Sequence, residues 1–183
     1  MAADSMRAHK INAQRMKIQY EMVTIRIHHF FDIIRDLRTG EKIPADTNYR
    51  HSYHSVANIL RDSPGIKMKI VIGVDSVCNR CVHNSEGKCD DPLTTKKGFA
   101  MKHDYNWWLD NKILEICNFS EGQIVTPNEV CISAYNYLEN IYCIYELDPE
   151  ENINTRKKDF IDGLKFYSAH NNFKLKYLSK YST

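Results

Sequence analysis

Two segments of the chain alternate apolar and polar residues in the way that a half-buried β-strand does. Residues 23–28 (VTIRIH) form the first segment, and residues 66–74 (IKMKIVIGV), rich in β-branched side chains, form the second. The second segment runs directly into residues 75–92, a polar stretch with the pattern of neither a helix nor a strand. The pattern therefore predicts two strands and, after the second, a long loop.

Helical spacing of apolar residues marks most of the remaining chain. Thr126 and Glu129 form the capping pattern of a helix start, with Pro127 in the first turn. Gly40 is expected to stop the first helix. The predicted helices cover residues 29–37, 47–62, 104–117 and 127–145, with a last helix around Phe160, Ile161, Leu164 and Tyr167.

These elements predict an α+β fold, in which a small sheet with packed helices carries a cysteine-rich metal loop and a helical C-terminal extension follows. We expect residues 1–22 to form a basic N-terminal extension and residues 23–130 to form the metal-binding α+β domain. Residues 131–183 are expected to form the helical extension. The tyrosines of this extension are expected to pack inside the protein or to form a homodimer surface.

The composition is that of an ordinary globular protein. Of 183 residues, 43% are hydrophobic and 26% are charged, which excludes a disordered or collagen-like chain. The net charge of +2 is too small to predict a nucleic-acid or membrane-surface partner. No run of about 18 apolar residues is present to span a bilayer, and the N-terminus lacks the apolar core of a signal peptide. We therefore expect a cytoplasmic protein whose six cysteines are thiols or metal ligands.

Three cysteines in the loop after the second strand form a candidate metal site. Cys78 and Cys81 form a C-x-x-C pair, and Cys89 follows after seven residues. Two such thiolates can face one metal centre, and Gly87 allows the loop to close so that the third reaches it. Thiolate ligands select zinc or an iron–sulfur cluster, and the spacing does not distinguish the two. The alternative is a thioredoxin-like redox pair, although that pair requires a helix N-terminus where this sequence has a loop.

Three cysteines leave one position of a tetrahedral centre open. The candidates for it are His28, His29 and Asp32, near the end of the first predicted strand. Two adjacent histidines there are expected to project to different sides, so only one should face a shared site. His29 and Asp32 are three residues apart, which places them on one face of a helix. The alternative is that the histidine pair is structural and packs at the strand end.

Other titratable residues have simpler interpretations. His51 and His54 are expected on a solvent-exposed face of the second helix, although their spacing would also let them share a site. His83, inside the cysteine loop, could replace Cys89 in a zinc site. Asp75 either orients a ligand histidine or starts the turn of the loop. The remaining cysteines are expected to be small buried hydrophobes: Cys117, Cys131 and Cys143.

Four segments, in this order, carry a family resemblance. They are Ile27–Asp32 with its histidine pair, Val56–Ile59, Asp75–Val82 followed by Cys89, and Asp110–Leu114 followed by Gly122. Over residues 23–126 the chain resembles a small family of prokaryotic proteins described as iron–sulfur binding, whose members carry G-H-H-L-L-C, V-x-N-M and D-D-I-C-x-x-C-P. The resemblance implies that Cys78, Cys81 and Cys89 bind an iron–sulfur cluster, with [4Fe–4S] favoured and zinc as the alternative.

Asp32 stands where this family has a cysteine. The resemblance therefore leaves three fillings for the fourth position: Asp32, one of His28 and His29, or an iron open to solvent. An open iron implies an enzyme that activates a small substrate, of a lyase or sulfur-transfer type, with the two histidines as acid–base or positioning groups. A fully ligated cluster implies a redox partner instead. The alternative from a different class is a structural zinc module with a Cys₃His site, used for partner binding.

Overall fold

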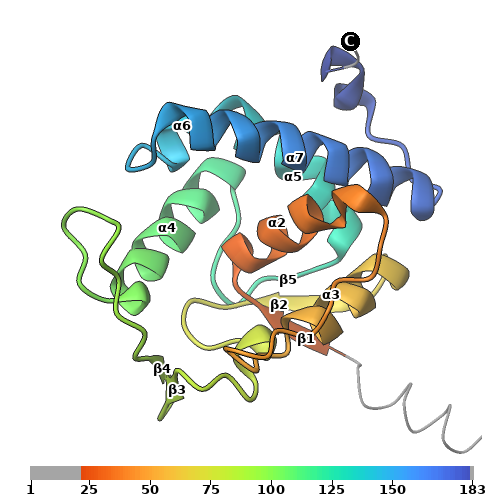
Figure 1. Ribbon diagram of the computed structural model, residues 1–183. Coiled ribbons are helices and arrows are strands. Elements are labelled where there is room, and N and C mark those ends of the chain that lie inside the picture. The colour runs from red at the N-terminus through yellow and green to blue at the C-terminus, as the bar shows by residue number, and fades with distance from the viewer. Residues whose placement is uncertain (1–21, 182–183) are drawn as a thin grey trace, which may run out of the picture.

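A three-stranded sheet and the helices packed on it give the protein an α+β fold, which confirms the predicted fold class (Figure 1). The computed structural model describes residues 22–181, so the predicted extension at residues 1–22 lies outside the described residues except for its last position. The strand order is β1 (Met22–Ile25), β2 (Lys67–Ile70), β5 (Ile124–Val125). β1 and β2 are parallel, whereas β5 is antiparallel to β2.

The two parallel strands alternate buried and exposed side chains, as their sequence pattern predicts. Val23 and Ile25 are buried in β1, and Met68 and Ile70 are buried in β2. The register places Ile25 opposite Ile70, so the buried side chains of both strands face the same core. β1 is shorter than predicted because helix α2 (Ile27–Asp36) begins only two residues after the strand ends.

Helix α2 lies below α7 (Glu150–His170) and above the sheet in the view of Figure 1. Its buried apolar side chains are Ile27, Phe30, Phe31, Ile33 and Ile34. Gly163 of α7 lies against the backbone carbonyl of Ile34, where a Cβ atom would have no room. α2 and α7 share one hydrophobic core, so residues before and after position 130 pack together.

Two helix boundaries that the sequence predicts are present in the structure. Thr126 and Glu129 form the predicted capping box, and Gly40 ends the first helical segment with a φ of 74°. None of the helices in the described part of the chain has the length and apolar character that a membrane span requires. The remaining helical elements are η1 (Leu37–Thr39), α3 (Tyr53–Asp62), α4 (Lys102–Cys117), α5 (Pro127–Glu139), α6 (Ile141–Ile144) and η3 (Lys176–Tyr181).

Helix α3 starts at Tyr53, later than its sequence pattern predicts. Oδ1 of Asp46 accepts hydrogen bonds from the backbone N–H groups of Asn48 (2.7 Å) and Tyr49 (2.9 Å). An aspartate that binds the backbone of the residues after it favours a turn over a helix. The loop formed in this way is bound to the cysteine loop, because the Val82 N–H donates to the carbonyl of Tyr49 at 3.0 Å.

The segment predicted as a cysteine loop contains a short β-hairpin, which the sequence did not predict. The segment begins with the turn η2 (Ser76–Cys78), and the strands β3 (Asn84–Ser85) and β4 (Lys88–Cys89) form the hairpin. Glu86 and Gly87 connect the strands, with φ values of 49° and 82°. Positive φ at both positions is the geometry of a two-residue type I′ turn. The hairpin carries the third cysteine back toward the C-x-x-C pair.

Candidate metal centre

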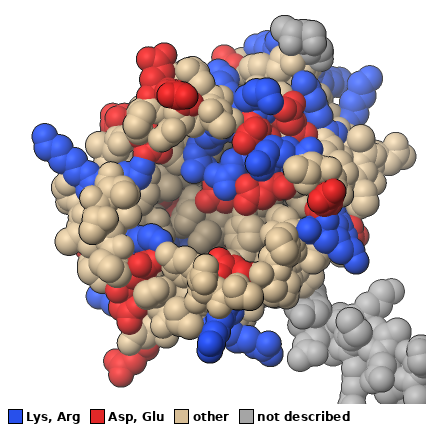
Figure 2. Space-filling view, viewed as in Figure 1, with Lys and Arg blue, Asp and Glu red and all other residues tan. Residues whose placement is uncertain are grey.

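A cavity of about 410 Å³ opens where the chain leaves the two parallel strands β1 and β2, and Figure 2 shows it as a hollow in the face of the molecule. Parallel strands direct the residues that follow them to the same edge of a sheet, where α/β proteins bind ligands. The cavity wall includes all the residues that the sequence predicts for the site: His28, His29, Asp32, Cys78, Cys81 and Cys89.

The two adjacent histidines lie side by side. His28 and His29 occupy the first turn of α2, both line the cavity, and their ring centroids are 4.3 Å apart. The sequence pattern predicts that the two histidines project to different sides of a strand, whereas both line the cavity, because the helix begins before residue 28. Successive side chains are about 100° apart around a helix, whereas they point to opposite faces of a strand.

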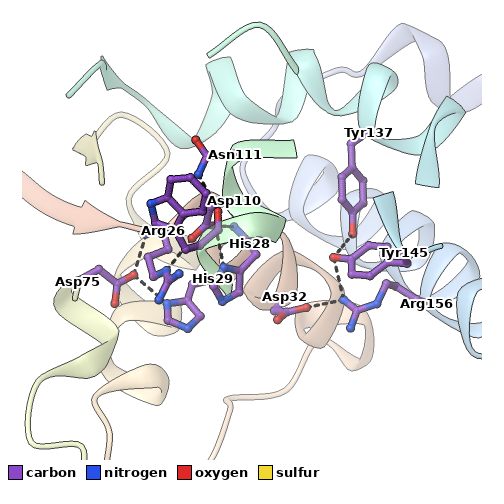
Figure 3. Close-up of polar contacts among 11 residues, drawn as sticks. Arg26, His28, His29, Asp32, Asp75, Asp110, Asn111, Tyr137, Tyr145 and Arg156 are labelled. Atoms are coloured by element: carbon purple, nitrogen blue, oxygen red, sulfur yellow. Dashed lines mark hydrogen bonds and ion pairs between the residues drawn. The ribbon is translucent and has the colours of Figure 1, made fainter. Parts of the chain in front are cut away.

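A buried aspartate holds each histidine ring (Figure 3). Nδ1 of His28 lies 2.7 Å from Asp110, and Nδ1 of His29 lies 2.8 Å from Asp75. The same carboxylates cap α2, since they accept the backbone N–H groups of His28 (3.1 Å) and Arg26 (2.8 Å). Within residues 22–181, Nε2 of neither ring has a hydrogen-bond partner. A carboxylate on one ring nitrogen, with the other nitrogen unused, is typical of histidines that bind metal.

Asp75 also shapes the cysteine loop. Its Oδ1 accepts hydrogen bonds from the backbone N–H groups of Val77 (3.0 Å) and Cys78 (3.2 Å), which form the turn η2. The two interpretations that the sequence left open are therefore both correct. One carboxylate starts the turn and orients His29.

The charges around the two histidines act on them in opposite ways. Arg26 Nε donates to Asp110 at 2.7 Å, and although burial opposes ionisation, His28 and Arg26 lower the pKa of Asp110 to about 2. Burial lowers the pKa of His28 despite the attraction of Asp110. Burial acts in the same direction on His29, but the Asp75 carboxylate outweighs it and raises the pKa of His29. His28 is therefore the neutral ring at pH 7, and His29 holds a proton more readily.

Two of the loop thiols, Cys78 and Cys89, are poor nucleophiles. Burial, with the charge of Asp75, raises the pKa of Cys78 to about 12, and burial also raises the pKa of Cys89. A thioredoxin-like redox pair requires a thiol whose pKa is lowered. The raised pKa values therefore argue against such a redox pair.

One compact group of ligand atoms lies in the cavity wall. A ring nitrogen of His29, a carboxylate oxygen of Asp75 and Sγ of Cys78 all lie within 4.8 Å of one another. No other group of three such ligand atoms is this compact among the described residues. The three cysteine sulfurs line one cavity but are therefore farther apart than the ligands of this group. Nitrogen, oxygen and sulfur donors together suit zinc or iron.

A family model described as "Protein of unknown function (DUF1284)" matches residues 46–162 of the 183-residue chain. The chain belongs to this family. The DUF1284 match includes the cysteine loop and Asp110, and it begins after the histidine pair. No curated protein matches the chain, and no solved structure does. Membership in DUF1284 agrees with the expectation that the chain belongs to a family of unknown function. Binding of an iron–sulfur cluster stays a prediction.

Asp32 lies outside the DUF1284 match and has two arginine partners. Its Oδ1 accepts hydrogen bonds from Nη1 of Arg35 (2.8 Å) and of Arg156 (2.6 Å). Burial opposes ionisation, but both guanidinium groups lower the pKa of Asp32. Figure 3 shows Asp32 on the side of Arg156 and Tyr145, away from Asp75. A carboxylate that already neutralises two cations is a weaker ligand for a metal cation.

Several residues of the site were not predicted. Asp110, inside the DUF1284 match, lies 82 residues from His28, and no local pattern links the two. It does lie three residues before Ile113, on the apolar face of its helix, and a charged residue on such a face is the signal that could have identified it. Arg156 gave no such signal. The expectation that His51 is solvent-exposed was wrong, because it lies half-buried on the cavity wall.

Proposed function

We propose that this DUF1284 protein binds an iron–sulfur cluster, [4Fe–4S], through Cys78, Cys81 and Cys89. The observation that carries the proposal is that these cysteines line one cavity together with two aspartate-bound histidines. No fourth cysteine lines the cavity among the described residues. One iron of such a cluster would therefore be held by a ligand other than cysteine.

The three cysteines do not form a compact ligand group of their own among the described residues, as the ligands of one zinc ion would. Cysteines ligate different irons of a cluster, so their sulfurs stand farther apart than the ligands of one zinc ion. Of the three cysteines, only Cys78 belongs to the compact group with His29 and Asp75. A cation lies near each of two thiols, Arg26 near Cys78 and Lys102 near the third cysteine, but the carboxylates of Asp75 and Asp91 act more strongly on the same thiols.

The histidine pair lines the same cavity as the three cysteines, so it would be available to act beside an iron that no cysteine holds. A bound cluster would supply a Lewis acid at that position. His28 is buried with a lowered pKa and has Nε2 available as a base or ligand, whereas Asp75 raises the pKa of His29, which makes His29 the better proton donor of the two. We therefore propose an enzyme that activates a small substrate by lyase or sulfur-transfer chemistry. In this proposal Asp32 positions Arg156 and is not the fourth ligand.

The compact group favours one second candidate, a structural zinc site. His29, Asp75 and Cys78 would provide three of the four ligands, and another cysteine of the loop would complete the tetrahedron. Such a site would hold the cysteine loop against the start of α2 and present it to a partner. Zinc at about one per chain, without visible absorption, is the signature that separates this candidate from a cluster.

Single serine substitutions test the proposal after anaerobic purification. We expect Cys78→Ser, Cys81→Ser and Cys89→Ser each to lose the broad visible absorption of the cluster. Cys143→Ser is the matched control, because Cys143 on α6 is exposed, in contrast to the prediction that it is buried. This control should keep the absorption. A colourless wild-type protein, or full absorption in all three loop variants, would contradict the proposal.

A further inference from the structure

We infer that the side of the cavity formed by Arg156 and Tyr145 binds the carboxylate group of a small organic acid. This inference names a substrate class for the proposed cluster site, so it rests on the proposed function. Arg156, Tyr145 and His29 all line the cavity, and Figure 3 shows the first two on the side opposite His29 and Asp75. A molecule held at Arg156 would extend toward the histidines and the cysteines.

Arg156 is fixed in place and keeps unused donors. Its Nη1 donates to Asp32 (2.6 Å) and to the hydroxyl of Tyr145 (3.3 Å). The guanidinium carbon lies 4.3 Å from the centroid of the Tyr145 ring, so the group is stacked as well as hydrogen-bonded. Within residues 22–181, no acceptor contacts Nη2 or Nε of Arg156. A fixed guanidinium with two unused nitrogens is a preformed fork for a carboxylate.

The hydroxyl of Tyr145 adds a second unused donor. It accepts hydrogen bonds from Tyr137 (2.9 Å) and from Arg156, and its own proton has no acceptor among the described residues. The side chain is buried, with 2% of its surface exposed, yet it lines the cavity. A buried donor without an acceptor costs free energy, so such groups are normally satisfied by a partner. A ligand oxygen in the cavity would provide that acceptor.

The other charges of the wall favour a singly charged carboxylate over a phosphate. Lys96 lies beside Arg156 but pairs with Asp148. Asp91 pairs with Lys102 at 2.5 Å, so this pair adds no net charge to the wall. Asp46 also lines the cavity, and its carboxylate would repel a doubly charged anion more strongly than a singly charged one. A volume of about 410 Å³ is that of a small-molecule site. The wall therefore suits an organic acid with one carboxylate at the Arg156 end.

Titration of the full chain with three singly charged acids, acetate, succinamate and glutaramate, tests the inference. The anaerobically purified protein is followed by calorimetry, with neutral glutaramide and inorganic phosphate as comparison probes. We expect at least one of the three acids to bind, glutaramide not to bind, and phosphate to bind more weakly than that acid.

Two variants assign the binding to the proposed residues. Arg156→Lys loses the planar fork and Tyr145→Phe loses only a hydroxyl, so we expect each to weaken binding by about tenfold. Arg38→Gln is the control, because Arg38 pairs with Asp36 and Asp159 and does not line the cavity. It should leave the affinity unchanged. Tyr145→Phe removes no charge, so it remains informative if Arg156→Lys is poorly folded.

Four results would overturn the inference. The first is that none of the three acids binds, and the second is that glutaramide binds as tightly as they do. The third is that the affinity is unchanged in Tyr145→Phe and in any folded Arg156→Lys protein. The fourth is that phosphate binds more tightly than the acids. Metal content is measured on the same samples. Acid binding to wild-type protein that holds no iron would contradict only the proposed cluster, and an intact cluster without acid binding would contradict only this inference.

Discussion

Two aspartates, each with several hydrogen bonds, organise the candidate centre at the scale of single residues. Asp75 binds the backbone of Arg26, the ring of His29 and the turn of the cysteine loop. Asp110 binds the ring and the backbone of His28. Each carboxylate therefore fixes the start of α2 and the orientation of a histidine at once. Replacing either should disturb the site more than the loss of one hydrogen bond would.

We expect Asp75→Asn to reduce metal affinity by about 10- to 100-fold, because carboxylates that orient metal-binding histidines typically contribute this much. The measurement is metal retention during titration with a chelator. Asp62→Asn is the control, since Asp62 pairs with Arg61 and His170 at the surface. Equal metal retention in Asp75→Asn and wild-type protein would show that Asp75 does not support the centre.

Asp110 should make the stability of the fold depend on pH in acid. Burial opposes its ionisation, but His28 and Arg26 lower its pKa from 3.8 to about 2. The ionised carboxylate therefore stabilises the folded state above about pH 4, and this contribution is lost as the pH falls toward about 2. The shift corresponds to about 2 kcal/mol.

Urea denaturation of wild-type protein and Asp110→Asn at a series of pH values measures this contribution. The free energy of unfolding of the wild type should fall more steeply than that of the variant between about pH 4 and about pH 2. Parallel pH dependence of the two proteins would show that Asp110 is not the group responsible.

At the scale of elements, α2 and α7 are in close contact near the C-terminal end of α2. Gly163 of α7 has no room for a Cβ atom, because the carbonyl oxygen of Ile34 occupies that place. The obstacle is backbone and cannot move as a flexible side chain could. The two helices must separate if residue 163 gains a side chain.

We expect Gly163→Ala to lower the free energy of unfolding by about 2 kcal/mol, measured by urea denaturation. Helix propensity alone would favour alanine by about 1 kcal/mol, so a net loss reports the clash with α2. Gly65→Ala is the matched control, because nothing lies within 4 Å of an added Cβ there. Its effect should stay within about 0.5 kcal/mol. Equal stability of both variants would contradict the close packing of α2 and α7.

The sequence predicts these elements where the signal is local. The capping box at Thr126 and the stop at Gly40 are confirmed, because each depends on residues next to one another. The start of α2 before His28 was missed, since a six-residue alternation fits a strand and also a strand followed directly by a helix. The late start of α3 was missed because Asp46 competes for the backbone of the residues after it.

For the candidate site, too, the sequence identifies the residues with a local signal and misses the partners that only the fold brings to them. The ligating residue types of the cysteine loop and the histidine pair are visible in the sequence because cysteine and histidine carry distinctive chemistry. Their partners are not visible. Asp110 lies 82 residues from His28, and Arg156 lies 124 residues from Asp32, so only the folded chain brings them together.

At the scale of the whole molecule, the cavity lies between helices of the hydrophobic core and the cysteine loop, which has few core contacts. Helices α2 and α7 belong to the hydrophobic core, whereas residues 75–92 form a loop with a two-stranded hairpin. Few buried apolar contacts hold this loop, so a bound centre would contribute much of its order.

Hydrogen–deuterium exchange before and after chelation checks this expectation. We expect exchange to rise in residues 75–92 and to stay unchanged in α7, whose core contacts do not involve the centre. Exchange that rises uniformly along the chain would mean that the centre supports the entire fold. No change in residues 75–92 would contradict metal binding by the loop.

The most direct test of the central claim is the iron, acid-labile sulfide and zinc content of the full chain after anaerobic purification. The account predicts about four irons and a similar amount of sulfide per chain, with little zinc. Zinc at about one per chain, without iron or sulfide, would contradict it.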